Sequence, residues 1–128
     1  MDSRMFKHCE RSGTVEDCLF CKIVQGAIPS KKVLETETVY AFHDIDPKAP
    51  VHILLIPKKH IRSAQTLSPE DALVVGDIHL AAQEAAKAAG VAEDGYRIVT
   101  NVGDHGHQTV HHLHYHLLGG RQMLWPPG

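Results

Sequence analysis

Three histidines alternate with apolar residues in the stretch His112-Leu113-His114-Tyr115-His116-Leu117-Leu118. Successive side chains of an extended strand point to opposite faces, so this spacing predicts a strand over residues 111–118 with all three imidazoles on one face, about 6 to 7 Å apart. The interleaved leucines and tyrosine take the other face. Neutral imidazole can act as a nucleophile, a general acid or base, or a metal ligand. The row therefore predicts either a metal-binding cluster or a catalytic face.

Outward from this row, the chain divides into strand-like and helical patterns. A short helix is predicted over residues 17–25, where Gly26 and Pro29 stop it. Stretches rich in turn residues separate the strand-like runs. These runs occupy residues 32–35, 39–44, 51–57 and 96–102.

The clearest helix lies between Ser68 and Gly90. Ser68 suits an N-cap and Pro69 the first helical position, while Asp71 is placed to complete a capping box. Apolar and small residues recur between these ends at helical spacing, which predicts a face packed in the core. That stripe consists of Val74, Ile78, Ala81, Ala82 and Ala85.

Strands outnumber helices and follow one another, so the predicted class is α+β: an antiparallel meander sheet of about five strands with one long and one short helix. At 128 residues, 43% of them hydrophobic, the chain fits one domain with a single core. We expect that domain over residues 17–128, including the C-terminal tail, after a poorly ordered polar lead-in over residues 1–16. Because a small sheet has edges to protect, we expect it to extend across a homodimer.

Charge and hydropathy limit the partners. A formal net charge of −2 leaves no broad basic footprint for nucleic acid or an anionic membrane. No apolar run approaches the roughly 18 residues that a membrane helix needs, and the first residues lack the apolar stretch of a secretory signal. We therefore expect a cytoplasmic protein that binds neither nucleic acid nor membrane.

The three cysteines are Cys9, Cys18 and Cys21. They cannot all pair within one chain, and a reducing compartment keeps them as thiols. Cys18-Leu19-Phe20-Cys21 is a Cys-x-x-Cys pair, typical of half a zinc site or of a redox motif. A thioredoxin-type motif follows a strand, whereas a polar stretch precedes this pair, which disfavours the redox interpretation.

A loop rich in glycine and histidine, Gly103-Asp104-His105-Gly106-His107-Gln108, leads into the histidine row. Backbone and imidazole N–H donors that meet there suit an anionic group, and phosphate is the natural candidate. One histidine could attack phosphorus and form a phospho-histidine intermediate. No Gly-Lys-Ser/Thr follows a glycine run, so a bound nucleotide would not use a P-loop.

The row resembles the signature of the histidine triad (HIT) superfamily, which implies a HIT-like fold. Other stretches look like the histidine triad nucleotide-binding (Hint) branch, and the likeness extends over roughly residues 17–128. They are Cys18-Leu19-Phe20-Cys21-Lys22-Ile23, Ala41-Phe42-His43-Asp44-Ile45, residues 49–61, Gly95-Tyr96-Arg97, Gly119-Gly120-Arg121-Gln122-Met123 and Trp125-Pro126-Pro127-Gly128.

The resemblance implies a hydrolase, an adenosine 5′-monophosphoramidase or purine nucleoside phosphoramidase. Such an enzyme cleaves the P–N bond of a nucleoside 5′-phosphoramidate to a nucleoside monophosphate such as AMP and an amine, and it requires no metal for catalysis. His114 matches the family nucleophile, which forms a nucleotidyl-histidine intermediate that water then hydrolyses. His116 and His112 flank it, and would bind phosphate oxygens and assist proton transfer to the departing amine.

The resemblance also implies the nucleotide-binding residues. Asp44 matches the carboxylate that binds the ribose hydroxyls, and Ile45, Phe42 and His43 belong to the base pocket. His107 departs from the pattern because the family usually has glycine there, and glycine allows backbone geometry that histidine resists. The remaining positions, on the phosphate and ribose sides, are Asn101, His107, Gln108, Thr109, His114 and His116.

In some family members a Cys-x-x-Cys pair joins two histidines in a structural zinc site. The matching residues are Cys18, Cys21, His60 and His112, and two thiolates with two imidazoles suit tetrahedral zinc. If zinc binds there, His112 is structural and leaves the catalytic group.

Three other functions fit part of the sequence. One is a non-catalytic nucleotide-binding or scaffold protein, against which the intact His114 argues. Another is a dinucleoside polyphosphate hydrolase of a related branch, which the Trp125-Pro126-Pro127-Gly128 ending disfavours. The last is a zinc-binding structural module, which would unfold with a chelator and show no turnover.

Overall fold

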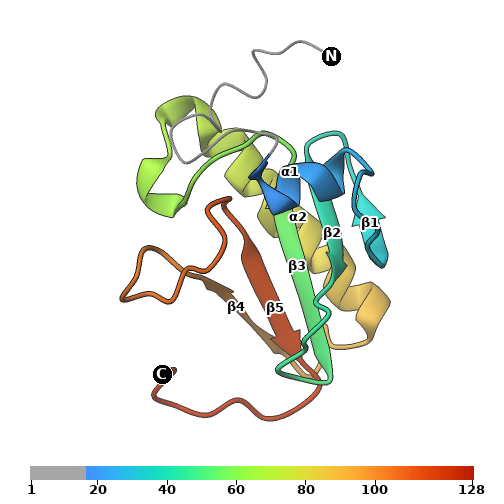
Figure 1. Ribbon diagram of the computed structural model, residues 1–128. Helices are drawn as coiled ribbons and strands as arrows, with labels where there is room; N and C mark the ends of the chain where they lie inside the picture. The colour runs from blue at the N-terminus through green and yellow to red at the C-terminus, as the bar shows by residue number, and fades with distance from the viewer. Residues whose placement is uncertain (1–16) are drawn as a thin grey trace.

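The computed structural model describes residues 17–128, so the lead-in predicted over residues 1–16, with Cys9, lies outside the described residues. Within residues 17–128, five strands form one antiparallel sheet, with a helix on each face (Figure 1). The α+β prediction is confirmed. The elements are α1 (Leu19–Val24), β1 (Lys32–Glu35), β2 (Val39–His43), β3 (Val51–Pro57), the 3-10 turns η3 (Ala64–Thr66) and η4 (Pro69–Asp71), α2 (Ala72–Ala89), β4 (Tyr96–Thr100) and β5 (Tyr115–Gly119).

The strand order is β1-β2-β3-β5-β4, and every neighbouring pair is antiparallel. The first three strands form the predicted meander, but the last two do not continue it in order. After β3 the chain crosses the sheet through α2 and returns in β4, which runs parallel to β3 because both are antiparallel to β5. A parallel return needs such a crossover. The crossover leaves a space between β3 and β4, and β5 fills this space.

Helix α2 forms as its end signals predict. The Ser68 backbone N–H donates to Asp71 Oδ2 at 2.9 Å, and Gly90 closes the helix in the left-handed region at φ 78°. Its buried face carries Ile78 and four alanines, whose small side chains let the helix pack closely on β2 and β3. No helix of the described chain has the length and apolar character needed to cross a bilayer.

The sheet separates two apolar clusters. Leu113, Tyr115 and Leu117 pack against α2 on the face that lies behind the sheet in Figure 1, as the alternation predicts. Phe20 from α1 and Phe42 from β2 pack on the opposite face. The histidine row therefore projects toward the α1 side of the sheet.

The strand that carries the row is shorter than predicted, because β5 begins only at Tyr115. His112 and His114 lie in the segment before it, where single hydrogen bonds replace the ladder. The Leu113 N–H donates to the carbonyl of Ile61 at 2.6 Å, and Thr100 Oγ1 donates to the carbonyl of His114 at 2.8 Å. The segment has no regular strand pairing, yet Leu113 and His114 still point to opposite faces of the sheet.

Candidate active site

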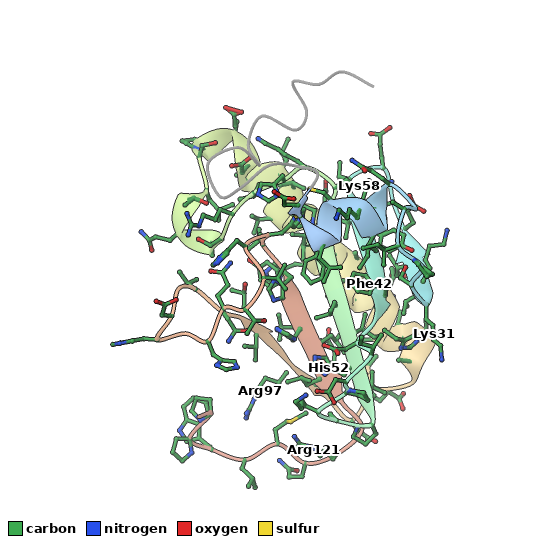
Figure 2. All side chains as sticks on the ribbon, in the orientation of Figure 1. Lys31, Phe42, His52, Lys58, Arg97 and Arg121 are labelled. Atoms are coloured by element: carbon green, nitrogen blue, oxygen red, sulfur yellow. The ribbon has the colours of Figure 1, made fainter. Side chains whose placement is uncertain are left out.

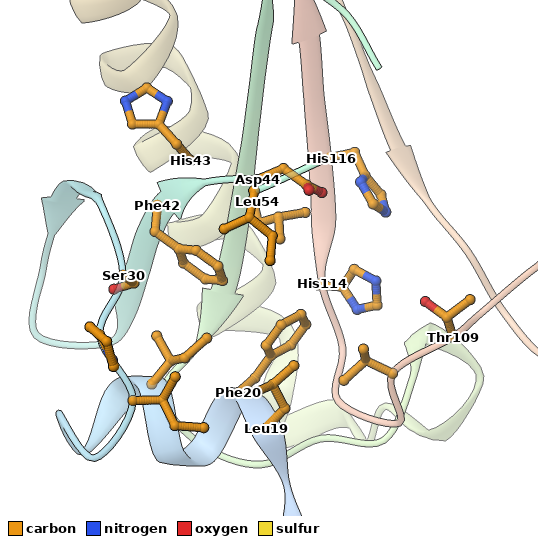
Figure 3. Close-up of a pocket in the computed structure, with 15 residues that line it drawn as sticks. Leu19, Phe20, Ser30, Phe42, His43, Asp44, Leu54, Thr109, His114 and His116 are labelled. Carbon is orange, nitrogen blue, oxygen red and sulfur yellow. The ribbon is translucent and has the colours of Figure 1, made fainter. Parts of the chain in front are cut away.

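Two adjoining cavities meet at His116 on the α1 side of the sheet. One, the apolar lobe, has a volume of about 260 Å³ and is walled by Phe20, Phe42 and Leu54, with His114 and His116 at its inner end (Figure 3). Aromatic and aliphatic walls around a few polar groups are typical of small-molecule sites.

The other cavity, the polar lobe, has a volume of about 460 Å³ and lies beyond His116. Asp44, Lys48, His107 and Thr109 are among its lining residues. Asp44, Thr109 and His116 border both lobes, so the two cavities form one two-part site.

His114 is held in one tautomer by its own backbone neighbour. Its Nδ1 lies 2.7 Å from the carbonyl oxygen of His112, which can only accept, so Nδ1 carries the proton and Nε2 keeps its lone pair. Burial lowers the pKa of His114, although the same hydrogen bond opposes the shift. The edge of Phe20 packs on its ring, with centroids 5.1 Å apart. The result is a neutral, oriented imidazole with a free nitrogen.

His52 completes the site, and sequence reasoning missed it. It lies on β3 opposite Leu118, diagonal to His116 on β5 (Figure 2). The backbone N–H of Lys48 donates to His52 Nδ1 at 3.0 Å, so the proton of the neutral ring sits on Nε2. That Nε2–H faces His116 Nδ1 at 2.9 Å, which leaves the His116 proton on Nε2. The one feature of the sequence that could have pointed to His52 is that it is a polar residue within the apolar run 51–57.

Burial lowers the pKa of His116 to about 4, and the neighbouring His114 and His52 add to the shift. Burial also lowers the pKa of His52, with Asp44 opposing it from 3.4 Å. Both rings are therefore neutral near pH 7. The possible ligand atoms of Asp44, His52 and His116 lie within 4.8 Å of one another, but the Nε2 proton that His52 directs at His116 disfavours a metal ion between them.

The residues expected to bind the nucleoside line the apolar lobe. Phe42 is buried, His43 lies at the edge of the lobe, and Ile45 is 98% exposed at its mouth. Asp44 stands between the lobes, where its Oδ1 accepts the N–H of Asp46 at 2.8 Å.

Gln108 has a different position from its neighbours. Its amide nitrogen donates to the carbonyls of Arg62 and Val110, and its Oε1 accepts the N–H of Gly103, so the side chain holds the loop together instead of lining a lobe. Asn101 and His107 line the polar lobe, and Asn101 donates to the Gly106 carbonyl at 2.7 Å.

His112 belongs to a second, buried cluster behind the lobes. Its Nδ1 lies 3.3 Å from Cys18 Sγ, 3.6 Å from Cys21 Sγ and 3.1 Å from His60 Nδ1. Its Nε2 donates to the Pro57 carbonyl at 2.9 Å, which leaves Nδ1 free to ligate.

The donor atoms of Cys18, Cys21, His60 and His112 all lie within 4.8 Å of one another. Hydrogen bonds from Cys21, His112 and His60 lower the pKa of the Cys18 thiol to about 2, against the opposing effect of burial. A thiolate, a second thiol and two inward-facing imidazoles are a donor set that fits zinc. The structure thus divides the histidine row: His114 and His116 face the lobes, and His112 faces the cysteines.

Comparison with known proteins agrees with this geometry. The family model described as the HIT domain matches residues 25–123. The chain belongs to the HIT family. An uncharacterized HIT-like protein of Synechocystis is 46% identical over 113 residues, which cover 88% of this chain and 98% of that protein.

Solved HIT structures superpose on the chain. A HIT family hydrolase from Legionella pneumophila has a TM-score of 0.85 at 51% identity, covering 88% of this chain and 100% of that one. A histidine triad nucleotide-binding protein from Candida albicans has a TM-score of 0.73 at 37% identity, covering 86% of this chain and 83% of that one.

The lowered pKa of His116 predicts a pH-dependent stability. The unfolded ring binds a proton below about pH 6.5, while the folded ring resists protonation down to about pH 4. Acidification through this window therefore favours the unfolded state. We expect His116→Gln to flatten the decline in the free energy of unfolding between pH 7 and pH 4.5 by about 1 kcal/mol, reduced from the full shift because water still reaches the ring.

Urea titrations at several pH values measure this effect. His105→Gln is the control, because His105 is exposed and borders neither lobe. Parallel pH profiles for the wild type and His116→Gln would contradict the prediction.

Proposed function

We propose that this HIT protein is a nucleotide-binding hydrolase that cleaves the P–N bond of purine nucleoside 5′-phosphoramidates, with adenosine 5′-phosphoramidate as the first substrate to test. One observation carries the proposal. The unprotonated Nε2 of His114 lies where an apolar lobe meets the neutral His116, which offers an N–H donor. This arrangement suits nucleophilic attack on phosphorus better than metal binding or scaffolding.

The walls of the apolar lobe favour a nucleoside. A purine fits between Phe20, Phe42 and Leu54, which supply flat and aliphatic contacts. Asp44 beside the lobe suits the ribose hydroxyls, because an ionised carboxylate accepts hydrogen bonds. The phosphoryl group then lies near Thr109 and the two facing histidines. The HIT relative from Candida albicans is described as nucleotide-binding, which agrees with this pose.

In the first step, the lone pair of His114 Nε2 forms a bond to phosphorus while the substrate P–N bond breaks. The amine leaves with the bonding electrons and takes one proton. The His52–His116 pair donates that proton. The pair acquires it from solvent when the anionic phosphoryl group binds, because a neighbouring negative charge favours the protonated ring.

In the second step, water attacks the nucleotidyl-histidine and Nε2 departs with its electron pair. The water proton returns to the His52–His116 pair, and the nucleoside monophosphate is released. Throughout, the Nδ1–H bond to the His112 carbonyl stabilises the positive charge that His114 carries in the adduct.

The test compares adenosine 5′-phosphoramidate with diadenosine tetraphosphate as substrates. We expect turnover of the phosphoramidate and at least about a thousandfold loss of kcat in His114→Ala, because no other lobe residue replaces the nucleophile. His105→Ala serves as the control. Mass spectrometry of acid-quenched wild type should detect a nucleotidyl adduct on His114.

The other outcomes separate the rival functions. Equal turnover by the wild type and His114→Ala would overturn the mechanism. AMP binding without turnover would indicate a nucleotide-binding scaffold, and faster cleavage of diadenosine tetraphosphate would indicate the polyphosphate hydrolase.

We also propose that Cys18, Cys21, His60 and His112 hold a structural zinc ion. The ion would contribute folding stability and no catalytic chemistry. Its ligands come from α1, from the loop after β3 and from the segment before β5, so it would tie three distant parts of the chain together.

Metal analysis and thermal unfolding test the zinc proposal. We expect one zinc per chain and a stabilisation of about 4 kcal/mol at a free zinc concentration a thousandfold above Kd. Cys21→Ser should abolish both effects, whereas Cys9→Ser should keep them. Co²⁺ substitution should give the absorption of a tetrahedral thiolate site. Sub-stoichiometric metal with no shift in Tm would contradict the proposal.

A homodimer paired through β4 is the assembly we propose. β4 ends the sheet order, so one side of this strand has no partner strand within residues 17–128. Arg97 on β4, labelled in Figure 2, donates to the carbonyl of Leu124. The neighbouring Leu124 and Trp125 side chains are 75% and 81% exposed. An open strand edge beside exposed apolar side chains favours a second copy of the chain.

Light scattering tests the dimer directly, and we expect twice the mass of one chain. Amides of residues 96–100 should exchange with deuterium more slowly as the protein concentration rises. A monomer mass at all concentrations would contradict this assembly.

A further inference from the structure

His107 occupies an unusual backbone position at the edge of the polar lobe. Its φ is 63°, and it is the one non-glycine residue with positive φ within residues 17–128. Side chains rarely adopt this conformation, although histidine tolerates it better than most. The side chain is exposed and lines the polar lobe together with His116 and Thr109.

The loop around His107 leaves this conformation little freedom. The His107 N–H donates to the Asp104 carbonyl at 3.0 Å, and the buried Gln108 ties the loop to Arg62. A Cβ at Gly106 would lie 2.4 Å from the carbonyl oxygen of Val102, so the backbone there is packed against itself. The loop therefore holds the His107 backbone in place and directs its side chain toward the polar lobe.

The other polar side chains of this lobe already have partners. Lys48 is paired with Asp46 at 2.7 Å, and Asn101 donates to a backbone carbonyl. His52 is hydrogen-bonded to His116, and Asp44 accepts the N–H of Asp46 and lies 3.4 Å from His52 Nε2. The His107 ring has no hydrogen bond or ion pair in the part of the chain that the structure describes. Recognition of a ligand in this lobe therefore falls to His107, with Thr109 near the phosphoryl group.

The reaction geometry indicates what enters the polar lobe. The nucleoside fills the apolar lobe, and His114 attacks phosphorus from its own side of the site. A nucleophile and a leaving group lie roughly in line on opposite sides of phosphorus. Of the two lobes that border His116, the nucleoside leaves the polar lobe open, so we expect the amine to depart toward it.

We propose that His107 hydrogen-bonds the substituent of the departing amine, so that the protein prefers phosphoramidates whose amine carries a polar, amide-bearing group. This inference rests on the proposed phosphoramidase function. The imidazole offers one N–H donor and one acceptor, which match the carbonyl oxygen and N–H of an amide. A glycine at this position would offer neither group.

Two substrates of equal shape test the proposal: adenosine 5′-phosphoramidates of glycinamide and of isobutylamine. The two amines differ in their intrinsic leaving ability. That difference cancels when the ratio of kcat/KM for the two substrates is compared between the wild type and a variant. We expect the wild-type preference in kcat/KM for the glycinamide substrate to fall about three- to tenfold in His107→Gly, the usual effect of one hydrogen bond.

Two further variants distinguish a direct contact between His107 and the substrate from an effect of altered loop structure. His107→Asn keeps hydrogen-bonding groups and tolerates the left-handed backbone, so it should retain most of the preference. His105→Gly alters a neighbouring exposed histidine that borders neither lobe, and should leave the preference unchanged. The Tm of His107→Gly should not fall below that of the wild type.

An unchanged preference in His107→Gly, with both substrates turned over, would overturn this inference while the phosphoramidase function stands. Absence of turnover of either substrate by the wild type would overturn the proposed function, and the inference with it. Equal loss of preference in His107→Asn and His105→Gly would also overturn it, because loop disturbance would then explain the effect.

Discussion

The hydrogen bond from His114 Nδ1 to the carbonyl of His112 is the constraint on which the site depends. It fixes the tautomer that leaves Nε2 free, and it lies in the segment before β5, where the strand ladder has not yet begun. The same His112 directs its side chain away from the lobes, toward Cys18 and Cys21. One residue thus orients the His114 ring through its backbone and joins the cysteine cluster through its own ring.

Local patterns in the sequence predicted most of the fold. The alternation of residues 112–118 gave the correct face for every side chain, and the signals at Ser68 and Gly90 gave the correct ends of the long helical segment. The strand length was wrong, because the ladders that pair β5 with β3 and β4 both begin only at Tyr115. The place of β5 between β3 and β4 depends on the crossover through α2, which no local pattern records.

The candidate site was predicted where its residues are close in sequence and missed where register brings them together. His52 is 64 residues from His116, and only the pairing of β3 with β5 makes them neighbours. Gln108 and His107 show the reverse: they are adjacent in sequence, but the turn buries one and exposes the other. Sequence resemblance grouped them as ligand contacts, whereas the geometry gives one to the loop and the other to the polar lobe.

Helix α1 has two faces with unrelated chemical demands. Cys21 and the capping Cys18 point to the buried cluster, whereas Leu19, Phe20 and Ile23 line the apolar lobe. Phe20 and Ile23 also belong to the apolar cluster on this face, so a change in the size of either side chain alters both the core packing and the shape of the lobe. Substitutions on one side of this six-residue helix would therefore reshape the lobe without changing the donor atoms on the other side.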